Sequence, residues 1–261
     1  MKFKLGCHLD YDIAIDSTFI FNIRVLEDSE QKIIAKNLQI APDLKPEKHL
    51  DRHLENSYMR LVVPEGKLTI DYQATVELAY SEPDKDNIPE IAPAKLPLDV
   101  VPYLYPSRYC QSDRLMKLAQ DEFGECQPGY LRVEAICDWI YRKIDYISGS
   151  SDSQTSAYDT AIERAGVCRD FAHLGIAFCR AMGIPARIFA AYAWELDPPD
   201  FHACFEAYLG DRWYRFDPTR MSNLKGLVKI GTGRDAADVA FATVFGSISL
   251  NQMDVYIDRA D

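Results

Sequence analysis

The chain has 261 residues, of which 48% are hydrophobic, and this length allows one large domain or two smaller ones. Its 29 basic and 40 acidic residues give a net charge of −11 without any basic block, so charge gives no support for binding nucleic acid or anionic membranes. No apolar run approaches the roughly 18 residues of a membrane span, and aspartates interrupt the N-terminal segment, so we expect neither a membrane segment nor a secretory signal.

The seven cysteines are odd in number and irregularly spaced, and none forms a Cys-x-x-Cys pair. This pattern argues against a disulfide framework and against a zinc ribbon. His49 and His53 lie four residues apart, but the sequence offers no third ligand, so we expect solvated histidines in a loop. The composition predicts free thiols in a reducing cytoplasm, with no metal and no cofactor.

The first 81 residues favour β-strands. The clearest segment is 68–80, in which alternate positions are apolar or aromatic: Leu68, Ile70, Tyr72, Ala74, Val76, Leu78 and Tyr80. The positions between them are mostly polar, which predicts a long, half-buried strand. A less regular alternation at 18–25 has the same character, and we expect an antiparallel β-sandwich or a small barrel.

Prolines recur from about residue 82, where the strand pattern ends. They stand at positions 83, 89, 93, 97, 102 and 106. Because proline fixes φ and lacks a backbone donor, this stretch predicts an extended linker and not a helix. We therefore expect an N-terminal β-sandwich-like domain over residues 1–104, linker included, and a second domain over residues 105–261.

Helical periodicity begins after the linker. Residues 112–123 carry a stripe of apolar side chains between Ser112, which suits an N-cap, and a glycine at the end. A second helix should follow Gly129 and continue to about residue 144. The polar stretch 148–156 predicts a loop, and a short helix over 157–164 should follow it.

The segment 166–182 predicts a buried helix that begins at or near Cys168. Apolar side chains cover nearly all its faces, and Gly183 and Pro185 follow at positions that end helices. The first backbone N–H groups of a helix are unpaired, and the dipole places positive potential there. A thiolate, the nucleophilic form of cysteine, is stabilised at such a place. Cys168 is thus a candidate nucleophile, although a cysteine can also be only a small core residue.

Residues 201–217 predict a β-hairpin with the two-residue turn Gly210-Asp211, after a separate strand at 187–194. The turn fixes which residues face each other: Tyr208 and Trp213, Glu206 and Arg215, Cys204 and Asp217. In this register His202 and Asp217 lie on one face as diagonal neighbours. A slip of one residue would place them on opposite faces.

Cys168, His202 and Asp217 are the residue types of a nucleophilic triad. In such a triad the imidazole takes the thiol proton, and the carboxylate orients the imidazole and stabilises its charged form. Cys204 is a competing thiol, but it lies within a strand and lacks a helix N-terminus. Asp217 stands before Pro218 and could be only a turn former. His202 could be only a polar residue at the end of a strand. The joint pattern favours the triad.

These residues resemble the transglutaminase-like superfamily, whose core is papain-like. Residues 166–188, GVCRDFAHLGIAFCRAMGIPARI, are similar to the nucleophile motif, and residues 202–219, HACFEAYLGDRWYRFDPT, are similar to the histidine and aspartate strands. The resemblance implies that Cys168 is the nucleophile, that His202 is the base and that Asp217 is the orienting acid. Family members often carry tryptophan where this chain has Cys204.

The resemblance is specific over about residues 100–250 and looser before them, where the chain is similar to the β-domain of bacterial transglutaminase-like proteins. It implies an α+β fold, with an N-terminal antiparallel β domain followed by a papain-like core of helices packed on an antiparallel sheet. It also implies a bacterial, cysteine-dependent enzyme that acts on a peptide or protein substrate.

The expected reaction is attack of Cys168 on an amide or peptide carbonyl, through a thioester intermediate. We expect hydrolysis by a peptidase or amidase, because no feature specifies an amine acceptor; transglutaminase crosslinking to an amine is the alternative. Acyl transfer from an acyl-CoA is a further alternative, but the sequence contains no phosphate-binding glycine loop that would support it. A non-catalytic binding module is disfavoured because a buried charged trio without a task is costly.

Two features of the expected site remain open at the level of sequence. The backbone N–H of Cys168 should be one donor to the oxyanion of the tetrahedral intermediate. The second donor could be Tyr146, Gln154 or Trp139. The polar loop at 148–156, just before the cysteine helix, should form one lip of the substrate groove.

Overall fold

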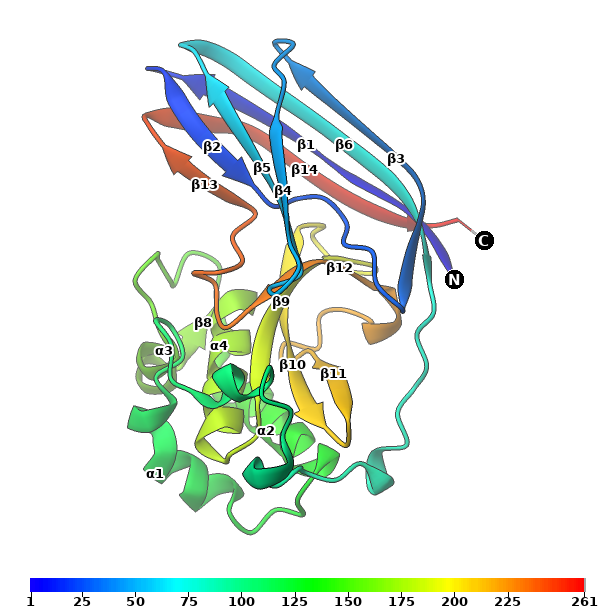
Figure 1. Cartoon of the computed structure of the whole chain (residues 1–261). Coiled ribbons are helices and arrows are strands. Elements are labelled where there is room, and N and C mark those ends of the chain that lie inside the picture. The colour runs from blue at the N-terminus through cyan, green and yellow to red at the C-terminus, as the bar shows by residue number, and fades with distance from the viewer. Residues whose placement is uncertain (261) are drawn as a thin grey trace.

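A β-sandwich lies above a part in which helices cover one face of a third sheet (Figure 1). The computed structural model describes residues 1–260. The sandwich strands are β1 (Lys2–Ile13), β2 (Ser17–Phe21), β3 (Gln31–Ala41), β4 (Glu47–Asp51), β5 (Asn56–Val63), β6 (Gly66–Leu78), β13 (Ala242–Phe245) and β14 (Ile248–Arg259). They form two antiparallel sheets, in the orders β14-β1-β6-β3 and β13-β2-β5-β4.

The third sheet is also antiparallel and has the order β11-β10-β9-β12. Its strands are β9 (Ala186–Ala193), β10 (Phe201–Leu209), β11 (Arg212–Phe216) and β12 (Leu227–Gly233). The helices are α1 (Ser112–Phe123), α2 (Tyr130–Lys143), α3 (Ala157–Glu163) and α4 (Cys168–Ala181). The predicted class, a β domain followed by helices on an antiparallel sheet, is confirmed.

Short elements complete the chain. β7 (Asp145–Tyr146) and β8 (Ala165–Gly166) form a parallel pair. Four 3₁₀ turns are η1 (Lys85–Asn87), η2 (Pro93–Lys95), η3 (Val101–Leu104) and η4 (Leu224–Gly226). The first three lie in the proline-rich linker, which contains no α-helix, as proline predicts. Within residues 1–260, no helix combines the length and the apolar character that a bilayer-spanning segment requires.

The longest sequence alternation forms β6. Its inward side chains from Leu68 to Leu78 are all buried in the sandwich core, as a half-buried strand predicts. β6 lies between β1 and β3, so each of its edges is hydrogen-bonded. The expected sandwich is therefore built around this strand.

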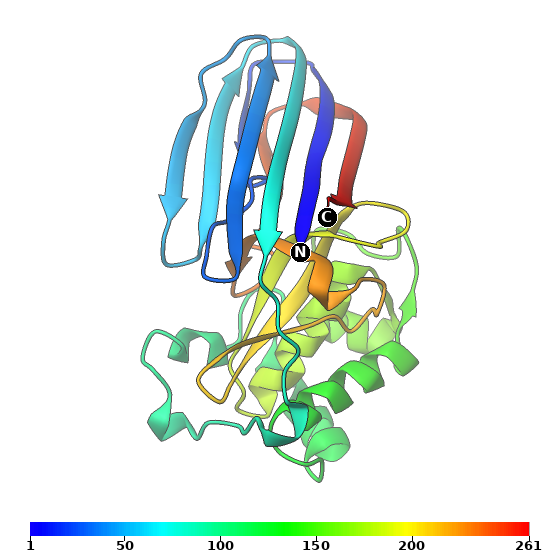
Figure 2. The same ribbon diagram turned by 90° about the vertical axis from the view of Figure 1, so that its right-hand side faces the viewer.

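The last two strands return to the sandwich. β14 pairs with β1, and β13 pairs with β2, so the two termini lie close together at the base of the sandwich (Figure 2). This pairing corrects our placement of residues 242–260 with the catalytic part. The physical reason is that β1 and β2 would otherwise present open edges. Most side chains of β14 are exposed, so its sequence lacks a buried alternation that could have revealed the pairing.

Two local expectations also need correction. His49 lies in the short edge strand β4 and not in a loop, although its side chain is exposed as expected. Ser112 is the first residue of α1, and the N-cap position belongs to Gln111. Neither difference changes the arrangement of the larger elements.

Helix α4 is the centre of the lower part. It contacts α1, α2 and α3 on one side and strands β9 and β10 on the other. Nearly all its side chains are buried, which explains the apolar sequence on every face. Gly175 allows close approach to the sheet, because a Cβ there would lie 2.5 Å from the ring of Phe205. Gly183, at φ +79°, follows the end of the helix, as predicted.

The third sheet is attached to the sandwich by apolar and charged contacts. The hydroxyl of Tyr192 in β9 donates to the carbonyl of Ile23 at 2.8 Å, and Tyr192 is part of the sandwich core. Further along the same sheet, the buried Glu206 of β10 accepts from Arg187 at 2.7 Å and from Lys229 at 3.4 Å. Lys229 in turn pairs with Asp28 at 2.9 Å.

Glu206 is held ionised by its cationic neighbours. Burial alone would raise the pKa of Glu206, but Lys229, Arg187 and Arg215 outweigh burial and lower it to about 2. Removing one partner of such a buried cluster leaves uncompensated charge in the interior. Glu206 lies on the same strand as His202, so the cluster also fixes the strand that carries the candidate base.

Glu206→Gln should destabilise the protein by roughly 3 kcal/mol at pH 7, measured by urea unfolding. The exposed pair of Arg60 and Glu47 offers a control, and Glu47→Gln should cost no more than about 0.5 kcal/mol. The folded-state pKa of Glu206 is depressed, so its contribution is present above the ordinary value of 4.5 and is lost as pH falls toward 2. Equal stability of the Glu206→Gln variant and the wild type at pH 7 would contradict the role of the cluster.

Candidate active site

Cys168 is the first residue of α4, as predicted. The chain leaves β8 through Val167, whose backbone N–H donates to Asp170 Oδ2 at 2.9 Å. Asp170 is fully buried and pairs with Arg169 at 2.9 Å, so a carboxylate caps the helix start. Gly166 is required by this cap, because a Cβ there would lie 2.7 Å from Asp170 Cβ. The Cys-Arg-Asp sequence therefore fixes where the helix begins.

His202 and Asp217 meet as the predicted hairpin register requires. Tyr208 faces Trp213 and Glu206 faces Arg215 in the observed ladder. His202 Nε2 and Asp217 Oδ2 lie 3.0 Å apart, and both side chains are buried. If Nε2 is the protonated ring nitrogen and donates to the carboxylate, Nδ1 holds the lone pair that can accept a thiol proton.

The carboxylate of Asp217 is held by the loop that follows it. Oδ1 accepts from the backbone N–H and the hydroxyl of Thr219 at 3.0 and 2.6 Å. Oδ2 accepts from the hydroxyl of Ser222 at 2.7 Å. Burial would raise the pKa of Asp217, but hydrogen bonds from His202, Thr219 and Ser222 lower it overall. Neither hydroxyl was predicted from the sequence, although the Asp-x-Thr turn pattern could have indicated Thr219.

Two thiols lie near the imidazole of His202. Burial by itself lowers the pKa of His202, whereas the neighbouring Cys204, Asp217 and Cys168 side chains, as hydrogen-bond partners, raise it well above 6.5 overall. Cys204 is completely buried, and burial raises its own pKa to about 12, so it carries no charge at neutral pH. Asp217 is therefore the charge that stabilises the imidazolium.

Cys168 and Cys204 differ in accessibility. Cys168 is partly exposed, whereas the Cys204 side chain faces a small apolar cluster with Phe189 and Leu227. A buried, protonated thiol is a poor nucleophile. The geometry thus favours Cys168 over its competitor, and the catalytic roles of the three predicted residues remain predictions.

His202, Cys204 and Asp217 offer donor atoms within 4.8 Å of one another, and these residue types can bind zinc. In this site, however, the donor atoms already have partners. Asp217 accepts hydrogen bonds at both oxygens, and His202 Nε2 is bound to the carboxylate. A cation would have to displace these donors, so the arrangement suits proton transfer better than metal binding.

The structure distinguishes among the three candidates for the second oxyanion donor. Trp139 is buried against Phe178, and its Nε1 donates to Glu122 at 2.9 Å, so its donor is engaged elsewhere. Gln154 is exposed in the polar loop. Tyr146 lies on β7 and pairs with Gly166 of β8, two residues before Cys168.

Tyr146 also has the protonation state that an oxyanion donor needs. Burial and the nearby Cys168 thiol raise the pKa of Tyr146, and the nearby backbone of Cys168 opposes this rise only in part. The hydroxyl therefore keeps its proton at neutral pH. The loop at 148–156 lies close by, because Arg169 donates to the carbonyl of Asp152 at 2.7 Å.

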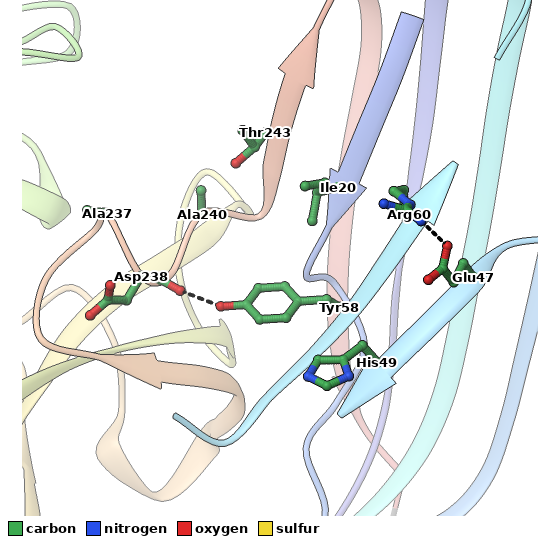
Figure 3. Close-up of a pocket in the computed structure, with 9 residues that line it drawn as sticks. All are labelled: Ile20, Glu47, His49, Tyr58, Arg60, Ala237, Asp238, Ala240 and Thr243. Atoms are coloured by element: carbon green, nitrogen blue, oxygen red, sulfur yellow. Dashed lines mark hydrogen bonds and ion pairs between the residues drawn. The ribbon is translucent and has the colours of Figure 1, made fainter. Parts of the chain in front are cut away.

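A pocket of about 340 Å³ lies away from these residues (Figure 3). It is formed by the outer face of the sheet β13-β2-β5-β4 and by residues 237–240. Tyr58 donates to the backbone carbonyl of Asp238 across it at 2.9 Å, and the pair of Arg60 and Glu47 forms its rim (Figure 3). None of its lining residues belongs to the predicted triad.

A second hollow, a groove of about 490 Å³, borders Asp217. Its walls come from the linker, α2 and the loop at 216–225. Ion pairs connect these walls, among them Lys225 with Glu82 at 2.7 Å. Neither Cys168 nor His202 lines this groove, so it approaches the carboxylate from another side.

Residues 116–218 match the transglutaminase-like superfamily, and residues 1–99 match the bacterial transglutaminase N-terminal domain. The chain is 49% identical to a candidate cysteine protease from Cytophaga hutchinsonii, whose crystal structure it matches with a TM-score of 0.96 over 100% of this chain and 91% of that one. The chain therefore belongs to the transglutaminase-like superfamily, as the sequence motifs predicted.

More distant relatives match by sequence. An uncharacterized protein of Mycobacterium leprae is 25% identical over 250 residues, covering 88% of this chain and 87% of the relative. An uncharacterized protein of Mycobacterium tuberculosis is 26% identical over 210 residues, covering 70% of this chain and 66% of the relative. The family and its solved member support a cysteine-based catalytic fold.

Iodoacetamide should alkylate Cys168 before any other cysteine of the native protein at pH 7. Cys126 is the matched control, because it is also partly exposed but lies outside the site. Peptide mapping should show Cys168 reacting at least about tenfold faster than Cys126, and His202→Ala should bring the two rates together. Labelling of Cys204 first, or equal rates for Cys168 and Cys126, would contradict the assignment.

Proposed function

We propose that the protein catalyses acyl transfer from an amide or peptide carbonyl through a thioester on Cys168, and that water completes the reaction. The observation that carries this proposal is the position of one imidazole, which lies 3.0 Å from a buried carboxylate and near the thiol at the start of a helix. Such an arrangement gives a nucleophile, a base and an orienting acid in the required order.

In the first half of the reaction His202 takes the thiol proton while sulfur attacks the carbonyl carbon. The carbonyl oxygen becomes an oxyanion, which the backbone N–H of Cys168 and the hydroxyl of Tyr146 can stabilise. The imidazolium then gives its proton to the nitrogen as the C–N bond breaks. The amine leaves, and a thioester remains on Cys168.

In the second half a water molecule replaces the amine. His202 takes a proton from the water, which attacks the thioester, and the carboxylic acid leaves as the proton returns to sulfur. Asp217 stabilises the imidazolium in both halves. We favour hydrolysis over transfer to an amine because no feature of the chain specifies an amine acceptor.

The substrate class and the compartment are parts of the same proposal. A peptide or protein substrate is supported by the partly exposed position of Cys168 beside the loop at 148–156. A reducing, cytoplasmic location is supported by the seven cysteines, which are all free thiols.

A panel of glutaminyl and peptidyl substrates, with and without a primary amine, tests the reaction. We expect ammonia release or peptide cleavage by the wild type, little incorporation of the amine, and at least about a 10³-fold loss in the Cys168→Ser variant. Amine incorporation as the main outcome would establish crosslinking instead. Full activity of the Cys168→Ser variant would contradict covalent catalysis by this residue.

Tyr146→Phe should lower kcat by about 10²-fold, because it removes one of the two proposed oxyanion donors and keeps the ring. The ring contact with Phe171, at 5.7 Å between centroids, should preserve the local packing. Gln154→Ala is the control and should retain kcat within about twofold. The reverse result, with kcat lost in Gln154→Ala and kept in Tyr146→Phe, would assign the donor to Gln154.

A further inference from the structure

Asp217 has the most complete set of hydrogen bonds in the candidate site, and its two oxygens are held by different groups. The backbone and hydroxyl of Thr219 bind Oδ1, at 3.0 and 2.6 Å. Oδ2 instead receives His202 Nε2 at 3.0 Å and the hydroxyl of Ser222 at 2.7 Å. The backbone N–H of Ser222 adds a longer contact at 3.3 Å.

We propose that Ser222 is a positioning residue for the reaction, because its hydroxyl holds the carboxylate oxygen that binds His202. This inference rests on the proposed function. Thr219 anchors only the oxygen that does not contact the imidazole. Without the Ser222 hydroxyl, Oδ2 would keep only the longer contact with the Ser222 backbone N–H besides His202, and the carboxylate could tilt so that Oδ2 leaves its line with Nε2.

The loop is built to keep Ser222 in place. Arg220 adopts a left-handed φ of 57°, and its backbone N–H donates to the carbonyl of Asp217 at 3.2 Å. Its guanidinium pairs with Asp138 of α2 and lies 4.5 Å from the ring centroid of Tyr141. The backbone carbonyl of Asp217 thus closes the turn, and the side chain of Arg220 ties the turn to α2.

Asn223 provides the comparison. It follows Ser222 in the same loop and makes two hydrogen bonds of its own, with Lys225 at 3.1 Å and Glu195 at 3.3 Å. Neither bond reaches Asp217. Asn223→Ala should therefore report any loss of general loop stability. Only the Ser222 variants should lose the alignment of the Asp217 carboxylate with His202.

The test combines kinetics with NMR titration of the His202 ring in Ser222→Ala and Asn223→Ala. In Ser222→Ala we expect kcat to fall about tenfold with KM unchanged, since one hydrogen bond to a charged group is lost. The raised pKa of His202 should move back toward 6.5, because a displaced carboxylate stabilises the imidazolium less. Asn223→Ala should change neither quantity.

The other titratable groups around the ring stay the same in every variant. They are Cys168 at the start of α4, Cys204 on β10, Tyr146 on β7 and Asp200 before β10. A change in the pKa of His202 would therefore report on Asp217. A pair of variants with matched shape, Ser222→Thr and Ser222→Val, keeps the test valid if Ser222→Ala fails to fold.

Ser222→Thr retains a hydroxyl and should keep both kcat and the His202 titration close to wild type, whereas Ser222→Val should behave like Ser222→Ala. The proposal is overturned if the His202 pKa is unchanged in Ser222→Ala and Ser222→Val. A rise in that pKa also overturns it, since the hydroxyl would then compete with the imidazole for Oδ2. The titration needs no substrate, so it decides this inference even if the panel of amides shows no turnover.

Discussion

The hydrogen bond between His202 Nε2 and Asp217 Oδ2 is the contact on which the site depends. It directs one ring nitrogen to the carboxylate and leaves the other for a thiol. Both groups are buried, so the charge of the carboxylate acts on the imidazole with little screening by water. The same burial would raise the pKa of Asp217, but hydrogen bonds from His202 and from Thr219 and Ser222 of its loop outweigh it.

The rest of the molecule supports this contact through two elements. Helix α4 brings Cys168 to the imidazole, and its position is set by Asp170 at the start and by apolar packing along its length. Strand β10 brings His202, and the buried ion pairs of Glu206 connect that strand to β9 and β12. Loops of the sandwich pair with this sheet through Asp28 with Lys229 and Glu30 with Arg215, so the β domain is part of the scaffold that orients the base.

The hairpin and the cysteine helix were predictable because local chemistry determines them. A two-residue turn at Gly210 fixes the register, and the register alone places His202 near Asp217. Gly183 ends α4 for a similarly local reason. These features need only neighbouring residues, and the sequence contains them.

The features that were missed or left open depend on contacts that leave no regular pattern in the sequence. The return of β13 and β14 to the sandwich joins opposite ends of the chain, and β14 carries few buried residues that could signal it. Tyr146 could be named only as one of three candidate donors, because it approaches Cys168 through a parallel pair of only two residues in each strand. Ser222 reaches Asp217 because Arg220 turns the chain back, and a left-handed arginine has no distinctive sequence signal.

The most direct test of covalent catalysis is to trap the acyl-enzyme. The protein would be mixed with an activated ester of a short peptide, quenched with acid after a short interval, and analysed by intact-mass and peptide-mapping mass spectrometry. The account predicts one added acyl group, located on Cys168, formed much more slowly in the His202→Ala variant. An acyl group on another residue, or acylation of Cys168 at the same rate without His202, would contradict it.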